Sequence, residues 1–210
     1  MDAVVQFLRA RRWARFTLSG LSLVLLVAAV GLLGYPLYTN VRQHRIQQRL
    51  THQFASPELK QSYQARTAKV GDALTRITIP KINVDVVVVE GTTPSALKAG
   101  AGHYPATPLP CEEGNVAIAG HRTTYGKPFA NVDQLKKGDL VTLETPIGTC
   151  TYALSQDPFV VLADGKLSNG KSVVDNTPGQ KTLTLTSCHP KGSASHRIIV
   201  RATLVKGLNG

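Results

Sequence analysis

The longest run of apolar residues lies near the N-terminus. No charged residue occurs between Phe16 and Val41, and residues 18–33 consist of Leu, Val, Ala, Gly and Ser. A bilayer core of about 30 Å requires about 20 apolar helical residues, so residues 16–38 are expected to form a transmembrane helix. Four arginines precede it: Arg9, Arg11, Arg12 and Arg15. Because such charge holds an N-terminus in the cytoplasm, we expect a single-pass cell-membrane protein with a basic cytoplasmic segment at 1–15 and an extracellular remainder.

Two other interpretations compete with a membrane anchor. A cleaved signal peptide has a shorter apolar core and a small-x-small exit, whereas this run continues through residues 34–38 without such a pattern. Arg11-Arg12 also suggests a twin-arginine export signal, but four arginines beside a membrane helix need no such explanation. A signal anchor is therefore favoured.

Residues 39–73 are polar, and their composition tolerates helix. Their apolar positions are too sparse to predict a core. The segment is therefore expected to be a partly helical stalk or linker.

From Leu74 onward the chain changes to short β-rich runs separated by Gly, Pro, Asn and Asp, which is typical of an antiparallel sheet or barrel. The pattern predicts strands at 74–79, 84–90, 115–121, 139–145, 150–156, 181–188 and 197–205. Short helical turns are expected at 93–100 and 128–139. Residues 163–180 form a long, turn-rich connection of the kind that often carries function. We expect one mainly β domain over residues 74–207.

The net charge of +11 is concentrated before the predicted domain, since residues 1–50 hold seven arginines and one aspartate. The remainder is mildly basic, which favours an anionic membrane or cell-wall surface. It has no basic stripe with interleaved aromatic residues, so no nucleic-acid partner is expected.

The chain has three cysteines, Cys111, Cys150 and Cys188. Outside the cytoplasm a disulfide is permitted, and an odd count leaves one thiol free or paired between molecules. If two cysteines pair, we expect Cys111 with Cys150, because Cys188 lies where chemistry is expected. The sequence does not give the connectivity.

The stretch "TLTLTSCHPKGSASHRIIV" contains the candidate nucleophile. Alternation along a strand places Leu183 and Leu185 on one face and Cys188 on the other, at the end of a row of threonines. There the thiol would be partly open to solvent, as a reactive cysteine requires. An eight-residue connection suits a hairpin that brings Arg197 beside Cys188, where a guanidinium can stabilise a thiolate or an oxyanion.

The third candidate is His121, which follows the strand in "NVAIAGHRTTYGKPF" and could reach a groove shared with Cys188. Each residue also has an ordinary structural explanation: a buried small cysteine, a solvated edge arginine and a hydrogen-bonded loop histidine. His103, His189 and His196 compete as the base. Cys188, His189 and His196 are also possible zinc ligands, but their spacing fits no compact zinc motif, and we expect no metal.

Together these residues resemble the sortases, the membrane-anchored cysteine transpeptidases of Gram-positive bacteria. The resemblance rests on "TLTLTSCHP" followed by "HRIIVRA", with "NVAIAGHRTTYGKPFANVDQLKKGD" upstream, over most of residues 74–205. Cys188-His189-Pro190 and "AGHYPATPLP" are most similar to class E, a housekeeping type of actinobacteria. The resemblance implies an eight-stranded sortase β-barrel, a catalytic trio of His121, Cys188 and Arg197, and no cofactor.

The resemblance also implies a reaction and its partners. Cys188 would attack the Thr–Gly bond of a Leu-Ala-x-Thr-Gly or Leu-Pro-x-Thr-Gly sorting signal on a secreted protein. A cell-wall precursor amine would then resolve the thioacyl enzyme and attach that protein to peptidoglycan. The substrate-binding residues are not predicted.

Three alternatives stay open. A pilin-polymerising sortase typically carries a second C-terminal membrane segment and an N-terminal lid with an Asp-Pro-aromatic motif. The chain ends at "RATLVKGLNG", and its Asp157-Pro158-Phe159 is far from the N-terminus, so wall anchoring is favoured. A membrane-tethered β-barrel that only binds wall polymer or a partner would have Cys188 buried or disulfide-bonded. A thiol hydrolase would use the same residues.

Some sortases bind calcium, but the scattered carboxylates Glu112, Glu113, Asp164 and Asp175 are not expected to do so.

Overall fold

The structure, a computed structural model, describes residues 12–209 and divides after Tyr38 into two units. Up to that point the described residues belong to α2 (Arg12–Phe54), whose apolar side chains are largely exposed. By length and composition this helix is able to cross a membrane. Arg9, Arg11 and most of the predicted basic segment lie outside the described residues.

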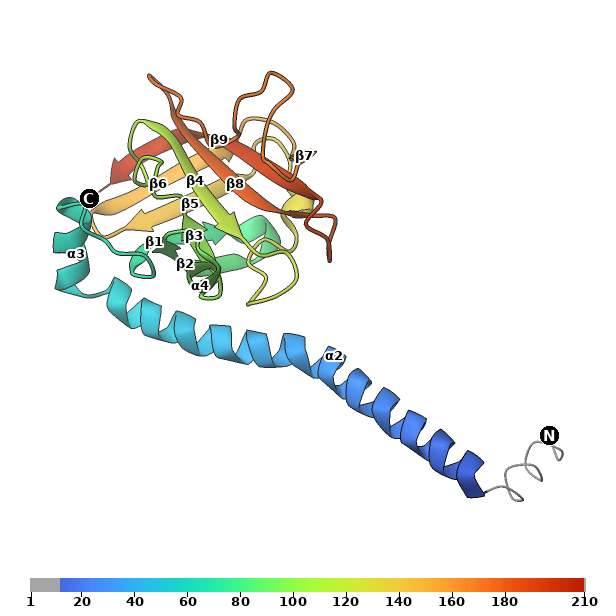
Figure 1. Ribbon diagram of the computed structural model, residues 1–210. Coiled ribbons are helices and arrows are strands. Elements are labelled where there is room, and N and C mark those ends of the chain that lie inside the picture. The colour runs from blue at the N-terminus through green and yellow to red at the C-terminus, as the bar shows by residue number, and fades with distance from the viewer. Residues whose placement is uncertain (1–11, 210) are drawn as a thin grey trace. The chain divides into compact units, whose positions relative to one another are not determined.

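The second unit contains a β-barrel together with residues 39–72 (Figure 1). The end of α2 and the short helix α3 (Pro57–Gln64) contribute Leu50, Leu59 and Tyr63, all buried. Leu50 and Leu59 belong to a hydrophobic cluster that includes strand residues of the barrel. The expectation that this segment has too few apolar residues for a core is therefore wrong. Polar side chains supply much of its contact with the barrel, and an apolar pattern does not reveal them.

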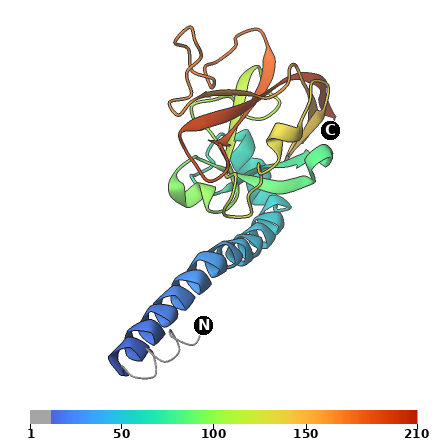
Figure 2. The same ribbon diagram turned by 90° about the vertical axis from the view of Figure 1, so that its right-hand side faces the viewer.

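Within residues 12–209, nine strands form one sheet in the order β6-β5-β1-β2-β3-β4-β8-β9-β7. Their bounds are β1 (Ala73–Ile79), β2 (Val84–Glu90), β3 (Ala101–His103), β4 (Gly114–Gly120), β5 (Leu140–Thr145), β6 (Gly148–Leu154), β7 (Phe159–Leu162), β8 (Lys181–His189) and β9 (His196–Asn209). An additional β6–β9 pairing closes eight strands into a barrel, and β7 pairs with the first part of β9. The predicted mainly β, eight-stranded barrel is confirmed (Figure 2).

All seven predicted strands are present, with ends shifted by a few residues. Two strands were missed. β3 has three residues, one of them a glycine, and β7 has four residues that are only half-buried or exposed. β3 is too short to show a period of two, and the four residues of β7 are all apolar and do not alternate, so only pairing with neighbouring strands identifies the two strands.

The predicted helical turns are shorter than expected. The first is α4 (Pro94–Leu97), where Thr93 accepts a hydrogen bond from Ala96 N and so caps the helix. The second contracts to the 3₁₀ turn η2 (Val132–Gln134); another 3₁₀ turn, η1 (Pro80–Ile82), follows β1. Phe129, Val132 and Leu135 are all buried. Their spacing of three residues suits the three-residue period of a 3₁₀ turn.

A disulfide joins Cys111 to Cys150, as the sequence led us to expect if two cysteines pair. Both cysteines are buried, and their Cα atoms are 5.8 Å apart. Cys111 N also donates to the Tyr152 hydroxyl at 3.1 Å. The bond therefore attaches the loop between β3 and β4 to strand β6, across a sequence separation of 39 residues.

Loss of this disulfide is predicted to destabilise the barrel. Replacing both Cys111 and Cys150 by Ala should lower the free energy of unfolding by about 2–4 kcal/mol, because a cross-link of this length restricts the unfolded chain. Urea unfolding of the full chain in detergent, followed by circular dichroism, measures the change. The free cysteine offers a control: Cys188→Ala should shift the midpoint much less. Equal midpoints for the double variant and the wild type would contradict this prediction.

Candidate active site

Three neighbouring strands bring the predicted catalytic residues to adjoining strand ends. In the antiparallel pair β8–β9, Cys188 lies opposite Arg197. In the parallel pair β4–β8, Ala119 lies opposite Thr186. His121 and Cys188 each follow that pair by two residues, on strands about 4.8 Å apart. The chain segments that carry all three residues are therefore adjacent.

Cys188 is a free, half-buried cysteine near the end of β8. Leu183 and Leu185 on the same strand are buried in the main core, as predicted, so alternation directs Cys188 to the other face. Ser187, which directly precedes Cys188, donates from its Oγ to Gly120 O at 2.7 Å. This hydrogen bond holds the ends of β8 and β4 together beside the thiol.

Arg197 is half-buried at the start of β9. Its Nη1 donates to the carbonyl oxygens of Ala194 and His196, each at 2.9 Å. Within residues 12–209, no carboxylate forms an ion pair with this guanidinium. Its charge is therefore held in place by the hairpin without being neutralised by a partner acid.

His121 follows Gly120, whose lack of a side chain is required because a Cβ would collide with the ring of Phe129. Phe129 N also donates to His121 O at 3.2 Å, which folds the loop back on itself. The rings of His121 and Tyr125 lie with their centroids 5.2 Å apart. Partial burial lowers the pKa of His121 below its ordinary value of 6.5, because desolvation disfavours the imidazolium.

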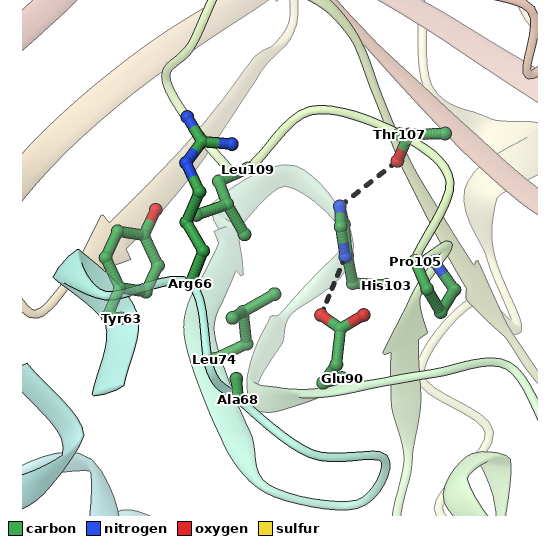
Figure 3. Close-up of a pocket in the computed structure, with 9 residues that line it drawn as sticks. All are labelled: Tyr63, Arg66, Ala68, Leu74, Glu90, His103, Pro105, Thr107 and Leu109. Carbon is green, nitrogen blue, oxygen red and sulfur yellow. Dashed lines mark hydrogen bonds and ion pairs between the residues drawn. The ribbon is translucent and has the colours of Figure 1, made fainter.

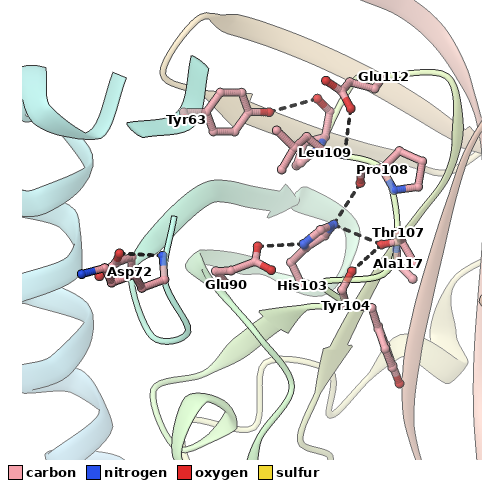
Figure 4. A network of polar contacts seen from close by, with 12 residues as sticks. Tyr63, Asp72, Glu90, His103, Tyr104, Thr107, Pro108, Leu109, Glu112 and Ala117 are labelled. Atoms are coloured by element: carbon pink, nitrogen blue, oxygen red, sulfur yellow. Dashed lines mark hydrogen bonds and ion pairs between the residues drawn. The ribbon is translucent and has the colours of Figure 1, made fainter. Parts of the chain in front are cut away.

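The other candidate bases have different surroundings. His103 is buried, and its Nδ1 lies 2.9 Å from Glu90 Oε2 while its Nε2 lies 2.9 Å from Pro108 O (Figure 4). A cavity of about 150 Å³ adjoins this histidine and Glu90, but His121, Cys188 and Arg197 are not among the residues that line it (Figure 3). His103 is therefore a structural residue that holds the loop between β3 and β4.

His189 and His196 flank the predicted site without sharing its face. His189 is adjacent to Cys188 in β8, so its side chain takes the opposite face of the strand. His196 lies opposite His189 in the β8–β9 register, and its Nδ1 is 3.0 Å from Ser195 Oγ. Of the four histidines considered, His121 has the strand position that matches Cys188.

A cavity of about 230 Å³ opens beside Arg197. It is lined by residues from the loop after β3, from β8, from the start of β9 and from the segment after β7: Tyr104, Ala163, Asp164, Gly165, Ser172, Val173, Val174, Thr186 and Arg197. The Tyr104 hydroxyl lies 3.0 Å from Thr186 Oγ1. The sequence predicted no substrate-binding residues. Tyr104 lies within the quoted stretch "AGHYPATPLP", but only the folded chain brings it to this cavity.

The long connection at 163–180 is fastened by a buried asparagine. Asn115 is fully buried, and its Nδ2 donates to Val173 O at 3.1 Å and to Asp175 O at 3.0 Å. Its Oδ1 accepts a bond from Thr184 Oγ1 at 2.8 Å. Arg201 adds a further bond to Val173 O at 3.1 Å. These contacts fix a loop that forms one wall of the cavity beside Arg197.

In the part of the chain that the structure describes, no group of three His, Cys, Asp or Glu residues has the arrangement of a metal site. The four carboxylates considered as calcium ligands form ion pairs or hydrogen bonds with other groups of the protein. Glu112 pairs with Arg66, and Glu113 accepts a bond from Gly179 N. Asp164 and Asp175 accept backbone bonds within their own turns.

A family model described as the sortase domain matches residues 77–205. The fold and the arrangement of strand ends agree with this match, and the chain belongs to the sortase family. Sortase D of Bacillus subtilis is 33% identical over 135 residues, which cover 63% of this chain and 64% of that protein. The chain thus spans less than two thirds of the length of the curated relatives that it matches.

Solved structures of sortases are also similar to this chain. The Clostridium perfringens sortase D5 transpeptidase has a TM-score of 0.64 and 29% identity, covering 78% of this chain and 98% of that chain. Sortase E1 of Streptomyces coelicolor, with a tripeptide in its active site, has a TM-score of 0.58 and 30% identity, covering 67% and 93%. Similarity to a named sortase E agrees with the class E resemblance.

The asparagine anchor generates a prediction about the cavity wall. Asn115→Ala leaves the carbonyls of Val173 and Asp175 without these donors, and should reduce stability by about 2–3 kcal/mol. Amide hydrogen exchange in residues 163–180 should accelerate more than in strands β1 and β5. Asn169→Ala is the matched control, because Asn169 is exposed and accepts a bond from Lys171 N in its own turn. Equal exchange in both variants would rule out the anchoring role of Asn115.

Proposed function

We propose that this chain is a membrane-anchored cysteine transpeptidase of the cell envelope. In the proposed reaction, the Cys188 thiol attacks a Leu-Ala-x-Thr-Gly or Leu-Pro-x-Thr-Gly sorting signal, and the signal is cleaved between Thr and Gly. The Thr carboxyl is then joined to an amine of a cell-wall precursor. The observation that carries the proposal is the strand register, in which a free thiol lies opposite an arginine and beside the strand end that leads to a histidine.

The proposed site is extracellular. The apolar part of α2 supports a single-pass anchor, and arginines before it favour a cytoplasmic N-terminus. The Cys111–Cys150 disulfide supports the same assignment, because disulfides persist in oxidising compartments. In this proposal residues 1–15 are cytoplasmic, residues 16–38 cross the membrane and the barrel acts outside the cell.

The first half of the reaction forms a thioester. Cys188 sulfur attacks the Thr carbonyl carbon, and the carbonyl electrons move to oxygen. Arg197 is suited to stabilise that oxyanion, because its guanidinium is charged, held by the hairpin and free of an acidic partner within the described chain. When the intermediate collapses, the Thr–Gly C–N bond breaks, and His121 donates a proton to the departing amine.

The second half transfers the acyl group. The incoming amine attacks the thioester carbonyl and gives its proton to His121 as the new amide forms. Cys188 leaves as the thiolate, so the enzyme returns to its starting protonation. The tripeptide in the active site of the Streptomyces coelicolor sortase E1 structure supports a peptide substrate for the cavity beside Arg197.

The test of this function is a transfer assay with the full chain in detergent, because residues 39–50 pack against the barrel. A Leu-Ala-x-Thr-Gly peptide and a glycine-based amine are added, and mass spectrometry follows the ligated product and the adduct on Cys188. Cys188→Ala should abolish both. Arg197→Lys should lose at least about tenfold in kcat/KM, because one ammonium does not reproduce a guanidinium fork.

Arg76→Lys is the control for the arginine variant, since Arg76 lies on β1 and pairs with Asp85. Near-normal activity of Arg197→Lys would remove Arg197 from the oxyanion role. A Cys188 adduct that turns over equally well with and without the amine would identify a hydrolase instead. Transfer that survives in Cys188→Ala would end the proposal.

The lowered pKa of His121 sets the acid limb of the pH profile. Thiol with imidazole and thiolate with imidazolium contain the same number of protons, so kcat/KM should be level between the two macroscopic pKa values of the pair. As the pH falls through the lower value, the pair gains a second proton and the nucleophile is lost. Because burial lowers the His121 pKa, this limb should lie below 6.5.

The measurement is kcat/KM for a peptide that does not titrate over this range. His196→Gln is expected to leave the limb unchanged, because His196 lies opposite His189 at the hairpin end. An acid limb above 6.5 in the wild type would show that His121 is not the group that controls it.

A further inference from the structure

The end of α2 contacts the barrel through a row of polar side chains. Thr39, Gln43 and Gln47 follow one face of the helix at intervals of four residues, and the first two are buried. Gln47 accepts a bond from Val87 N at 2.8 Å and donates to Val87 O at 3.0 Å. Since pairing of β2 with β3 begins at Val88, Gln47 bonds to a part of β2 that β3 does not reach.

The same helix face also reaches the loop that starts at His121. Asn40 Oδ1 accepts a hydrogen bond from Gly126 N at 3.1 Å. Gln43 lies against Gly126 so closely that a side chain at Gly126 would collide with the Gln43 amide. Gln43 Nε2 also donates to Ala99 O at 3.3 Å. The close approach of α2 therefore depends on glycine at position 126.

The contacted part of the loop has an unusual backbone. Tyr125, Gly126 and Lys127 have φ angles of 51°, 72° and 41°. Non-glycine residues rarely occupy this left-handed region, and such a conformation persists where surrounding contacts hold it. Lys127 N donates to Thr124 O at 2.9 Å within the turn, whereas the contacts from Asn40 and Gln43 come from outside it.

Tyr125 connects this turn to His121. Its ring lies against the imidazole, with centroids 5.2 Å apart, and so contributes to the partial burial of His121. Both ends of the loop have their own attachments, because Phe129 N donates to His121 O and Arg122 pairs with Asp133. The stretch around Tyr125 is the part that α2 contacts.

We propose that residues 40–43 of α2 are a positioning element of the active site, in which Asn40 and Gln43 hold the turn at Gly126 and thereby keep Tyr125 against His121. Only the expected effect of these contacts on kcat/KM rests on the proposed function. The effect on His121 itself can be measured without any substrate. In this arrangement the helix that continues from the apolar segment is part of the catalytic unit.

The test compares four variants of the full chain in detergent. Asn40→Leu removes the oxygen that accepts from Gly126 N but keeps a side chain of similar size, and Asn40→Asp keeps an acceptor oxygen. Gln43→Ala removes the side chain that lies against Gly126. Gln48→Leu is the control, because Gln48 is exposed on the same helix and lies beside His44. The first readout is the NMR titration of ¹³C-labelled histidine, with the His121 signal identified by its absence in His121→Gln. The second is kcat/KM in the transfer assay.

Asn40→Leu and Gln43→Ala should expose His121 and move its titration midpoint up toward 6.5, with kcat/KM lower by about tenfold because the imidazole is misplaced. Asn40→Asp and Gln48→Leu should stay close to the wild type. A His121 titration that is the same in Asn40→Leu, Gln43→Ala and the wild type would overturn the inference. If the wild type transfers no peptide while these two variants still shift His121, the proposed function fails and the positioning role stands.

Discussion

The hydrogen-bond register of β4, β8 and β9 is the constraint on which the rest of the site depends. Buried Leu183 and Leu185 hold β8 in this register, because a slip of one residue would turn them out of the core and turn Cys188 into it. The same ladder sets Cys188 opposite Arg197. Core packing and site geometry are thus two consequences of one set of backbone bonds, and substitutions in the leucine face would disturb both.

Polar side chains bonded to backbone hold the parts that the ladder does not reach. Asn115 fastens the long connection at 163–180, His103 holds the loop after β3, and Gln47 bonds to β2 beyond its pairing with β3. Each of these side chains is buried or half-buried, and each is matched to carbonyl or amide partners, so its burial leaves these groups satisfied. Such contacts give irregular segments a defined place beside the site without a large apolar surface.

Much of the fold and the site could be predicted because local patterns report them. The seven predicted strands appear with small shifts, whereas the apolar run at 16–38 lies within a helix that continues to Phe54. Alternation also gave the correct faces for Leu183 and Leu185, and the length of the hairpin placed Arg197 opposite Cys188. The matching position of His121 was an expectation from strand ends and from the family resemblance, and residue order alone did not establish it.

The sequence by itself determined the apolar helix, the β-rich texture and the residue types able to carry thiol chemistry, because each depends on neighbours within a few positions. Only the tertiary structure decided which strands meet. It closed the barrel through β6 and β9, added the short strands β3 and β7, and packed residues 39–64 against the barrel. It also brought His103 into contact with Glu90, and Asn115 into hydrogen bonds with the loop that forms the cavity wall. These contacts join residues far apart in the chain, and their energies depend on burial and partners that no local pattern contains.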